Sequence, residues 1–120
     1  MKTLFLIISA LALNVFGFSS TAYAADAAKG AEYMKKNNCA ACHGADYVKS
    51  TDASIPKLAG QHQDYLVQAL RQYRAGDSKT AALARNNAIM TGQAKAMSLA
   101  DIDNISAYFA SLKGDLLVRK

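Results

Sequence analysis

The sequence has few residues that could cross-link the chain or bind a metal ion. Its 120 residues include two cysteines, Cys39 and Cys42, and two histidines, His43 and His62. A disulfide between cysteines so close together would close a very short loop and add little stability. A structural zinc site needs four protein ligands, and these four residues have an uncommon spacing for one. The composition therefore argues against a disulfide-rich domain and against a zinc-stabilised one.

The sequence also lacks the patterns of several fold and function classes. No segment alternates β-branched and polar residues as a strand would, and there is no repeat or low-complexity segment. The formal net charge is +5 at pH 7, but the basic residues are spread along the chain rather than clustered. We therefore expect a helical domain that does not bind nucleic acid and whose mild positive charge suits acidic protein partners.

The chain begins with an apolar segment that has the features of a secretory signal. Lys2 precedes an apolar run over residues 4–18, which is shorter than the ~20 residues of a membrane-spanning helix. The letters AYA at residues 22–24 form a small-x-small pattern suited to signal peptidase. We expect residues 1–24 to be a cleaved signal peptide that directs the protein to the periplasm. Residues 25–120 are then expected to form a single domain.

Three segments show the periodicity of amphipathic helices. They cover residues 26–38, 62–76 and 98–114, with Asp26 and Ser98 as the N-caps of the first and third. Each has one apolar face, which predicts that the three helices share a core. The positions expected to face this core are Ala27, Gly30, Ala31 and Met34, then Tyr65, Leu66, Ala69, Leu70 and Tyr73, and then Leu99, Ile102, Ile105, Tyr108, Phe109 and Leu112.

Two connections between these segments are long for a compact domain. They cover residues 44–60 and 77–97, whereas most connections have about four to six residues. Three short helices alone would also form a thin core. We therefore expect the helices and the long connections to surround a large apolar cofactor.

The letters CAACHG at residues 39–44 hold both cysteines and one histidine. In C-x-x-C-H the two thiols can add across the vinyl groups of a heme, while the adjacent imidazole binds the iron. Cys39 and Cys42 are therefore predicted to attach one heme c covalently, with His43 as an axial ligand. Three alternatives remain: a thioredoxin-like redox pair, which normally follows a strand, a zinc site, and a local disulfide.

The one proline in the chain is a candidate for supporting this axial histidine. An axial histidine usually donates its second ring N–H to an acceptor that fixes the ring. Pro56 lies in the first long connection, is stiff, and has no amide hydrogen of its own. We expect its carbonyl to accept a hydrogen bond from His43. The alternative is that Pro56 only forms a turn.

The second axial ligand is expected to be a methionine. Met90 lies in the segment NNAIMTGQAKAM, which we expect to be irregular, with Gly92 letting the backbone approach a flat ligand. Met34 and Met97 are expected to pack in the core, and His62 is expected to be exposed. The alternative for Met90 is gap-filling in the core, where flexible methionines are common.

These residues resemble the class I bacterial c-type cytochromes, in particular the small periplasmic group whose domain also occurs doubled in diheme cytochromes c. The resemblance covers about residues 26–113, through CAACHG, PKLAGQHQDYL, MTG and DIDNISAYFASL. It implies an all-α class I cytochrome c fold, with three main helices and long loops wrapped around one heme c. The site it implies consists of thioether bonds from Cys39 and Cys42, His43 and Met90 as axial ligands, and the Pro56 carbonyl accepting from His43.

The resemblance also implies a close crossing of the first and last helices, with Gly30 against Tyr108. Two features depart from the family pattern. Met97 stands where the group often has leucine, so Met97 is the alternative axial ligand. Only one heme motif is present, so the chain is not the diheme form.

The sequence thus favours a periplasmic electron carrier rather than an enzyme. A methionine-ligated heme would cycle between ferrous and ferric iron, with no bond of any substrate made or broken. We expect a monomer or weak oligomer that meets membranes only through respiratory complexes. The alternatives are a permanent cytochrome subunit of a larger oxidoreductase, and a peroxidase or gas-binding protein with a labile sixth ligand. Docking is expected through exposed lysines around the heme edge: Lys35, Lys36, Lys49, Lys57 and Lys95.

Overall fold

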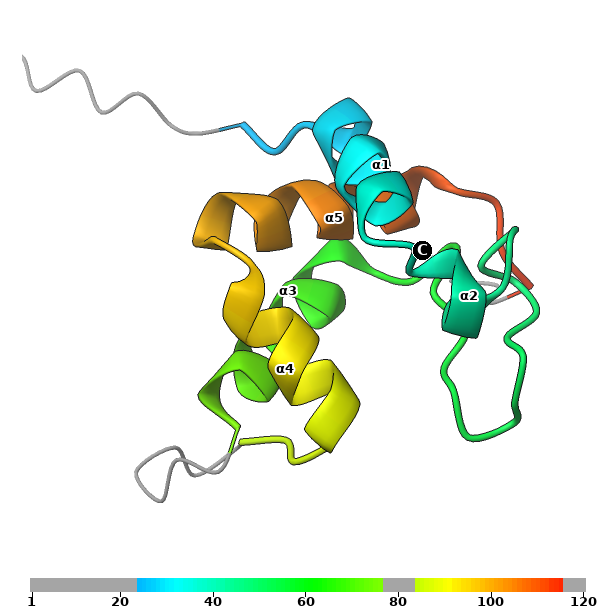
Figure 1. Ribbon diagram of the computed structural model, residues 1–120. Helices are drawn as coiled ribbons and strands as arrows, with labels where there is room; N and C mark the ends of the chain where they lie inside the picture. Colours follow the sequence, from blue (N-terminus) through cyan, green and yellow to red (C-terminus); the bar gives the residue numbers. More distant parts are fainter. Residues whose placement is uncertain (1–23, 77–83, 116–120) are drawn as a thin grey trace, which may run out of the picture.

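The computed structural model of the protein describes residues 24–76 and 84–115 (Figure 1). Within these ranges all regular structure is helical, which confirms the all-α prediction. No helix there is long and apolar enough to cross a membrane. Residues 1–23 of the expected signal peptide lie outside the described residues. The helices are α1 (Ala27–Lys36), α2 (Ala40–His43), α3 (Gln63–Ala75), α4 (Ala88–Ala96) and α5 (Leu99–Ser111).

The first and last helices cross at a glycine. Helix α1 begins after Asp26, whose carboxylate accepts hydrogen bonds from the amides of the first turn, as the N-cap prediction required. The Asp26 amide in turn donates to Asn104 Oδ1 of α5 at 2.7 Å. At Gly30 the two backbones are so close that a Cβ would collide with the Asn104 carbonyl and lie 2.9 Å from Tyr108 Cβ. The predicted contact of Gly30 with Tyr108 is therefore confirmed, and Asn104 belongs to it as well.

Helix α5 forms the centre of the core. Ser98 and Asp101 form a reciprocal capping box at its start, since the Ser98 hydroxyl accepts from the Asp101 amide and the Asp101 carboxylate accepts from the Ser98 amide. Ile102, Ile105 and Phe109 are at most 2% exposed. The prediction for Leu99 is wrong, because this residue in the first turn is 53% exposed.

Helices α3 and α4 pack against each other, and α3 also packs against α5 (Figure 1). Leu66 and Ala69 form the buried face of α3, as predicted, but Tyr65 of the same predicted face is 48% exposed. The irregular segment expected around Met90 is instead helix α4, which begins where the Asn87 side chain accepts from the Met90 amide at 3.0 Å. Gly92 lies inside this helix, and a Cβ there would have no atom within 4 Å. Gly92 therefore does not serve the close backbone approach that we expected of it.

Two glycines in helices permit a matched test of the α1–α5 crossing. We predict that Gly30→Ala lowers the free energy of unfolding by about 3 kcal/mol, because the new methyl group forces α1 away from α5. Gly92→Ala adds the same methyl group at an open helical position and should raise the free energy of unfolding by about 0.5–1 kcal/mol. Denaturant unfolding of the cofactor-loaded protein measures both. Equal stability of the two variants would contradict the crossing.

Candidate functional site

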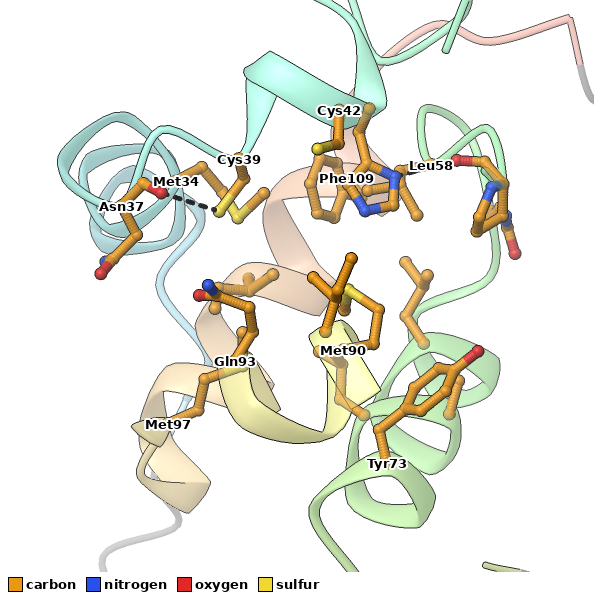
Figure 2. Close-up of a pocket in the computed structure, with 18 of the residues that line it drawn as sticks. Met34, Asn37, Cys39, Cys42, Leu58, Tyr73, Met90, Gln93, Met97 and Phe109 are labelled. Atoms are coloured by element: carbon orange, nitrogen blue, oxygen red, sulfur yellow. Dashed lines mark hydrogen bonds between the residues drawn. The ribbon is translucent and has the colours of Figure 1, made fainter. Parts of the chain in front are cut away.

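All five helices and the loop between α2 and α3 contribute to one pocket (Figure 2). Its cavity volume of about 180 Å³ far exceeds the water-sized voids of a close-packed interior. The space is therefore built to hold a ligand. The residues that line it are Met34, Asn37, Asn38, Cys39, Cys42, His43, Pro56, Leu58, Gln61, Tyr65, Leu66, Ala69, Leu70, Tyr73, Arg85, Ile89, Met90, Gln93, Met97, Ile105 and Phe109.

Both cysteines lie on the wall of this pocket. Helix α1 ends at Lys36, and Asn38 two residues later has a left-handed backbone with φ 52°. The Cys39 amide donates back to the Met34 carbonyl at 3.2 Å. This reversal starts α2, which carries Cys42 and His43. Cys39 is half-buried and Cys42 is exposed, and both are free thiols. Burial raises the pKa of the Cys39 thiol, so the neutral form is favoured.

The His43 ring is held by the residue that the sequence singled out for this purpose. His43 is 7% exposed, and its Nδ1 lies 3.0 Å from the Pro56 carbonyl oxygen. A carbonyl oxygen can only accept, so Nδ1 carries the proton and donates it. The neutral ring then has its lone pair on Nε2, which is the form that binds a metal ion.

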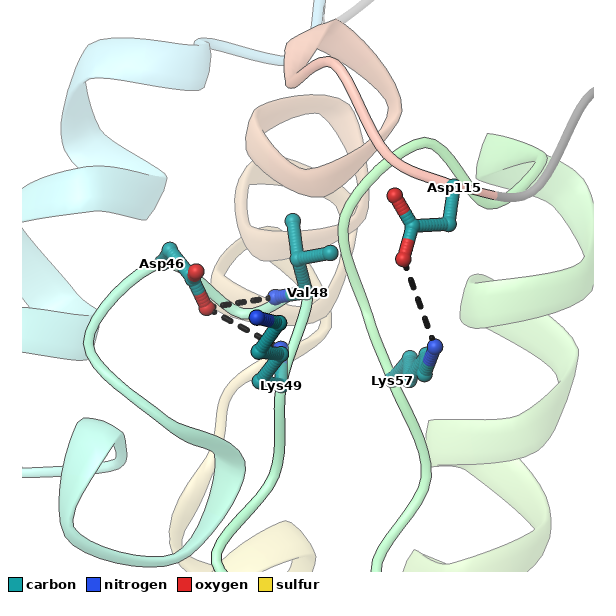
Figure 3. A network of polar contacts seen from close by, with 5 residues as sticks. All are labelled: Asp46, Val48, Lys49, Lys57 and Asp115. Carbon is teal, nitrogen blue, oxygen red and sulfur yellow. Dashed lines mark hydrogen bonds and ion pairs between the residues drawn. The ribbon is translucent and has the colours of Figure 1, made fainter.

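The loop that carries Pro56 is folded back onto α2 by hydrogen bonds of its own. Gly44 has φ 84°, and a Cβ there would collide with the Lys49 carbonyl. The Cys42 carbonyl accepts from the Thr51 amide at 3.0 Å and from the Thr51 hydroxyl at 2.9 Å. Asp46 Oδ1 accepts from the Val48 and Lys49 amides, which lowers the pKa of this carboxyl group (Figure 3). These contacts set the path of the chain toward Pro56.

An aromatic cluster fixes the same loop to α5. Tyr47 is 7% exposed, and its ring meets the Phe109 ring edge-on with a centroid distance of 5.0 Å. The Tyr47 carbonyl accepts from the amides of Leu58 and Ala59 at 3.0 and 3.1 Å. Phe109 also lines the pocket. The position of the loop therefore depends on α5.

Met90 reaches into the pocket from α4, across from Cys39 and Cys42 (Figure 2). Met97 lines the pocket as well, but it is 4% exposed and packs with Ile102 in the core. Helices α2 and α4 thus face each other across the pocket, one carrying His43 and the other carrying Met90.

The other sulfur and imidazole candidates lie where the sequence analysis expected them. Met34 is 4% exposed and belongs to the core cluster. His62 is exposed and is absent from the lining of the pocket. The five lysines expected to aid docking are all exposed, and none of them lines the pocket. Lys57 forms an ion pair with Asp115 at 3.4 Å (Figure 3).

Arg85 also lines the pocket and was not among the predicted site residues. Its Nε donates to Gln72 Oε1 at 2.8 Å, and its Nη2 donates to the Tyr65 hydroxyl at 3.3 Å. The hydrogen bond to the Tyr65 hydroxyl raises the pKa of Arg85 further above its already high value. No local pattern could have identified Arg85, because its partners come from α3, on the far side of residues 77–83.

The pocket fits a covalently held heme. Apolar side chains line most of it, and they suit the flat macrocycle. Two free thiols lie at its wall, next to a buried imidazole whose Nε2 is available. The thioether of Met90 faces them from α4 (Figure 2). This is the donor set of a heme c with two axial protein ligands.

Comparisons with known proteins agree with this geometry. The cytochrome c family model matches residues 27–113. The thiosulfate dehydrogenase electron acceptor of Thiomonas intermedia is 37% identical over 91 residues, which are 76% of this chain and 39% of that protein. Cytochrome c4 of Stutzerimonas stutzeri is 37% identical over 108 residues, which are 88% of this chain and 49% of that protein. Cytochrome c-554(548) of Halomonas halodenitrificans is 39% identical over 88 residues, which are 73% of this chain and 98% of that protein.

A solved structure shows the same fold. Reduced recombinant cytochrome c4 from Pseudomonas stutzeri superimposes with a TM-score of 0.66 and 37% identity, covering 77% of this chain and 48% of that one. The predicted class I cytochrome c fold is therefore confirmed. The chain spans half or less of the length of the first two relatives and almost all of the third. The family match over residues 27–113 shows that the chain belongs to the cytochrome c family and carries covalently bound heme c.

Proposed function

We propose that this protein is a periplasmic electron carrier and not an enzyme. Bound heme c supplies a one-electron couple between ferrous and ferric iron. Cys39 and Cys42 would hold it by thioether bonds, and His43 and Met90 would be the axial ligands of its iron. The observation that carries the proposal is the hydrogen bond from His43 Nδ1 to the Pro56 carbonyl, which leaves Nε2 free in a pocket that Met90 also lines.

Each protein group in this proposal has a distinct task. The Pro56 carbonyl holds the His43 ring in one tautomer and orientation, and makes Nε2 a better donor to iron. A methionine thioether favours the reduced iron, which raises the potential at which an electron is released. Apolar residues such as Leu66 and Phe109 exclude water from the site. Because these groups are already in place, little has to move when an electron enters or leaves.

The partner of such a carrier is a second redox protein. A relative of this chain is named a thiosulfate dehydrogenase electron acceptor. We extend only the general role to this chain, which is to accept electrons from a periplasmic dehydrogenase or respiratory complex. The formal net charge of +5, one unit of which belongs to Lys2 in the expected signal peptide, suits an acidic docking surface on that partner. A free carrier, monomeric or weakly associated, would meet several partners in turn, whereas a permanent subunit would co-purify with one.

The identity of the methionine ligand can be tested by absorption spectroscopy. We predict that Met90→Leu abolishes the weak long-wavelength band of sulfur-ligated ferric heme, because the thioether is lost while the apolar volume is retained. Met97→Leu is the matched control and should keep the band. Loss of the band in Met97→Leu alone would show that Met97 is the ligand. Colourless wild-type protein, expressed in a host that attaches heme c, would contradict the proposal as a whole.

The role of the lysines can be tested through the salt dependence of electron transfer. We predict that oxidation by ferricyanide slows as ionic strength rises from about 0.01 to 0.1 M, because salt screens attraction between this anion and the cationic surface. The double substitution of Lys35 and Lys36 by glutamine should weaken this dependence, since both precede Cys39 closely. Lys113→Gln is the matched control, because Lys113 is an exposed lysine just after the end of α5. A rate independent of salt would contradict docking by charge.

A further inference from the structure

Met90, the proposed second axial ligand, lies in the first turn of α4 (Ala88–Ala96). The first N–H groups of a helix have no carbonyl partner within it, so this turn frays first unless a side chain caps it. The side chains of the turn add little packing, because Ile89 is 71% exposed and Ala88 is exposed too. The position of the Met90 thioether therefore depends on what closes this turn.

Asn87 closes the turn with both of its oxygen atoms. Its side-chain Oδ1 accepts from the Met90 amide at 3.0 Å, and its carbonyl accepts from the Thr91 amide at 2.7 Å. The Asn87 backbone is extended, with φ −145° and ψ 118°, as is typical of an N-cap whose side chain folds over the turn. Asn87 thus binds the backbone amide of the ligand residue itself.

Packing holds α4 only from Thr91 onward. Thr91 and Ala94 are 8% and 0% exposed. A Cβ at Gly76 would lie 2.8 Å from Thr91 Cγ2, so the end of α3 lies directly against this side chain. The residues before Thr91 have no comparable burial. Loss of the cap would therefore free the chain up to Met90 and leave the rest of α4 packed on α3.

We propose that Asn87 is the positioning residue of the second axial ligand: it holds the first turn of α4 closed and so keeps the Met90 thioether on the heme iron. The inference rests on the proposed function, because it needs Met90 as an axial ligand. When the cap opens, the turn unwinds and the thioether leaves with its backbone. A small neutral base such as imidazole then takes the sixth position. The iron–sulfur bond breaks and an iron–nitrogen bond forms, with no change in oxidation state.

The test measures imidazole binding to the oxidised, heme-loaded full chain. Imidazole competes with Met90 for the iron, so the loss of the long-wavelength sulfur band gives its dissociation constant. The variants are Asn87→Ala, which removes the capping oxygen, and Asn87→Asp, which keeps one. Asp26→Ala and Ser98→Ala are the matched controls, because these residues cap α1 and α5 in the same way and those helices do not carry Met90.

We expect Asn87→Ala to bind imidazole about fivefold more tightly than the wild type, which is the factor that a typical lost cap corresponds to. Asn87→Asp should bind imidazole like the wild type. Asp26→Ala and Ser98→Ala should lose stability against denaturant without a change in imidazole affinity. The inference is overturned by an unchanged affinity in Asn87→Ala, by an equal rise in the two controls, or by an Asn87→Asp variant that matches Asn87→Ala.

A second measurement uses only the wild type. Amide hydrogen exchange is followed with and without saturating imidazole, and the samples are quenched, reduced and read by NMR. We expect imidazole to speed exchange of the Met90 amide by about tenfold or more, because the cap opens when the thioether leaves. The Met97 amide, which donates to the Ala94 carbonyl at the other end of α4, should be unaffected. Equal exchange of the Met90 amide in both samples would overturn the inference.

Failure of this inference and failure of the proposed function give different results. A wild type that shows the sulfur band, together with an Asn87→Ala variant whose imidazole affinity is unchanged, refutes only the role of Asn87. A wild type without the sulfur band refutes methionine ligation, and with it both proposals.

Discussion

The hydrogen bond between His43 Nδ1 and the Pro56 carbonyl is the contact on which the site depends. It fixes which ring nitrogen carries the proton, and therefore which nitrogen can bind iron. The contact exists only because the loop from Gly44 onward turns back to α2, and because Tyr47 fixes that loop against Phe109. A single side-chain orientation thus depends on packing that extends from α2 to α5.

Much of the fold could be predicted from local signals. Asp26 and Ser98 begin α1 and α5 where a capping side chain precedes an apolar periodicity, and both caps form as expected. Helix α4 was missed because its sequence contains Gly92 and polar residues and has little apolar periodicity. Its start depends on the Asn87 cap and its stability on packing against α3, and tertiary packing overrides weak propensity in this way. Leu99 was misplaced because helical periodicity fixes spacing, whereas exposure of the first turn depends on what lies beside it.

The candidate site likewise combines residues that local sequence signals predict with residues that only the folded chain brings together. Cys39, Cys42 and His43 are adjacent in the sequence, so their chemistry could be inferred from their spacing alone. Arg85 depends on Gln72 and Tyr65, which belong to another helix, so no spacing rule could identify it. The site is therefore a local attachment motif completed by residues that only the folded chain assembles. The motif indicates which cofactor is bound, and the distant residues complete the wall of its pocket.

The crossing of α1 and α5 at Gly30 has a consequence for the order of maturation. It joins segments that leave the ribosome at opposite ends of synthesis, and α1 leads directly into the cysteine motif. Until the last helix has been made, α1 has no partner at this contact, and Phe109 is absent from the pocket. The two thiols are then as accessible as in an unfolded peptide. Heme attachment at this stage would act on an open motif rather than on a closed pocket.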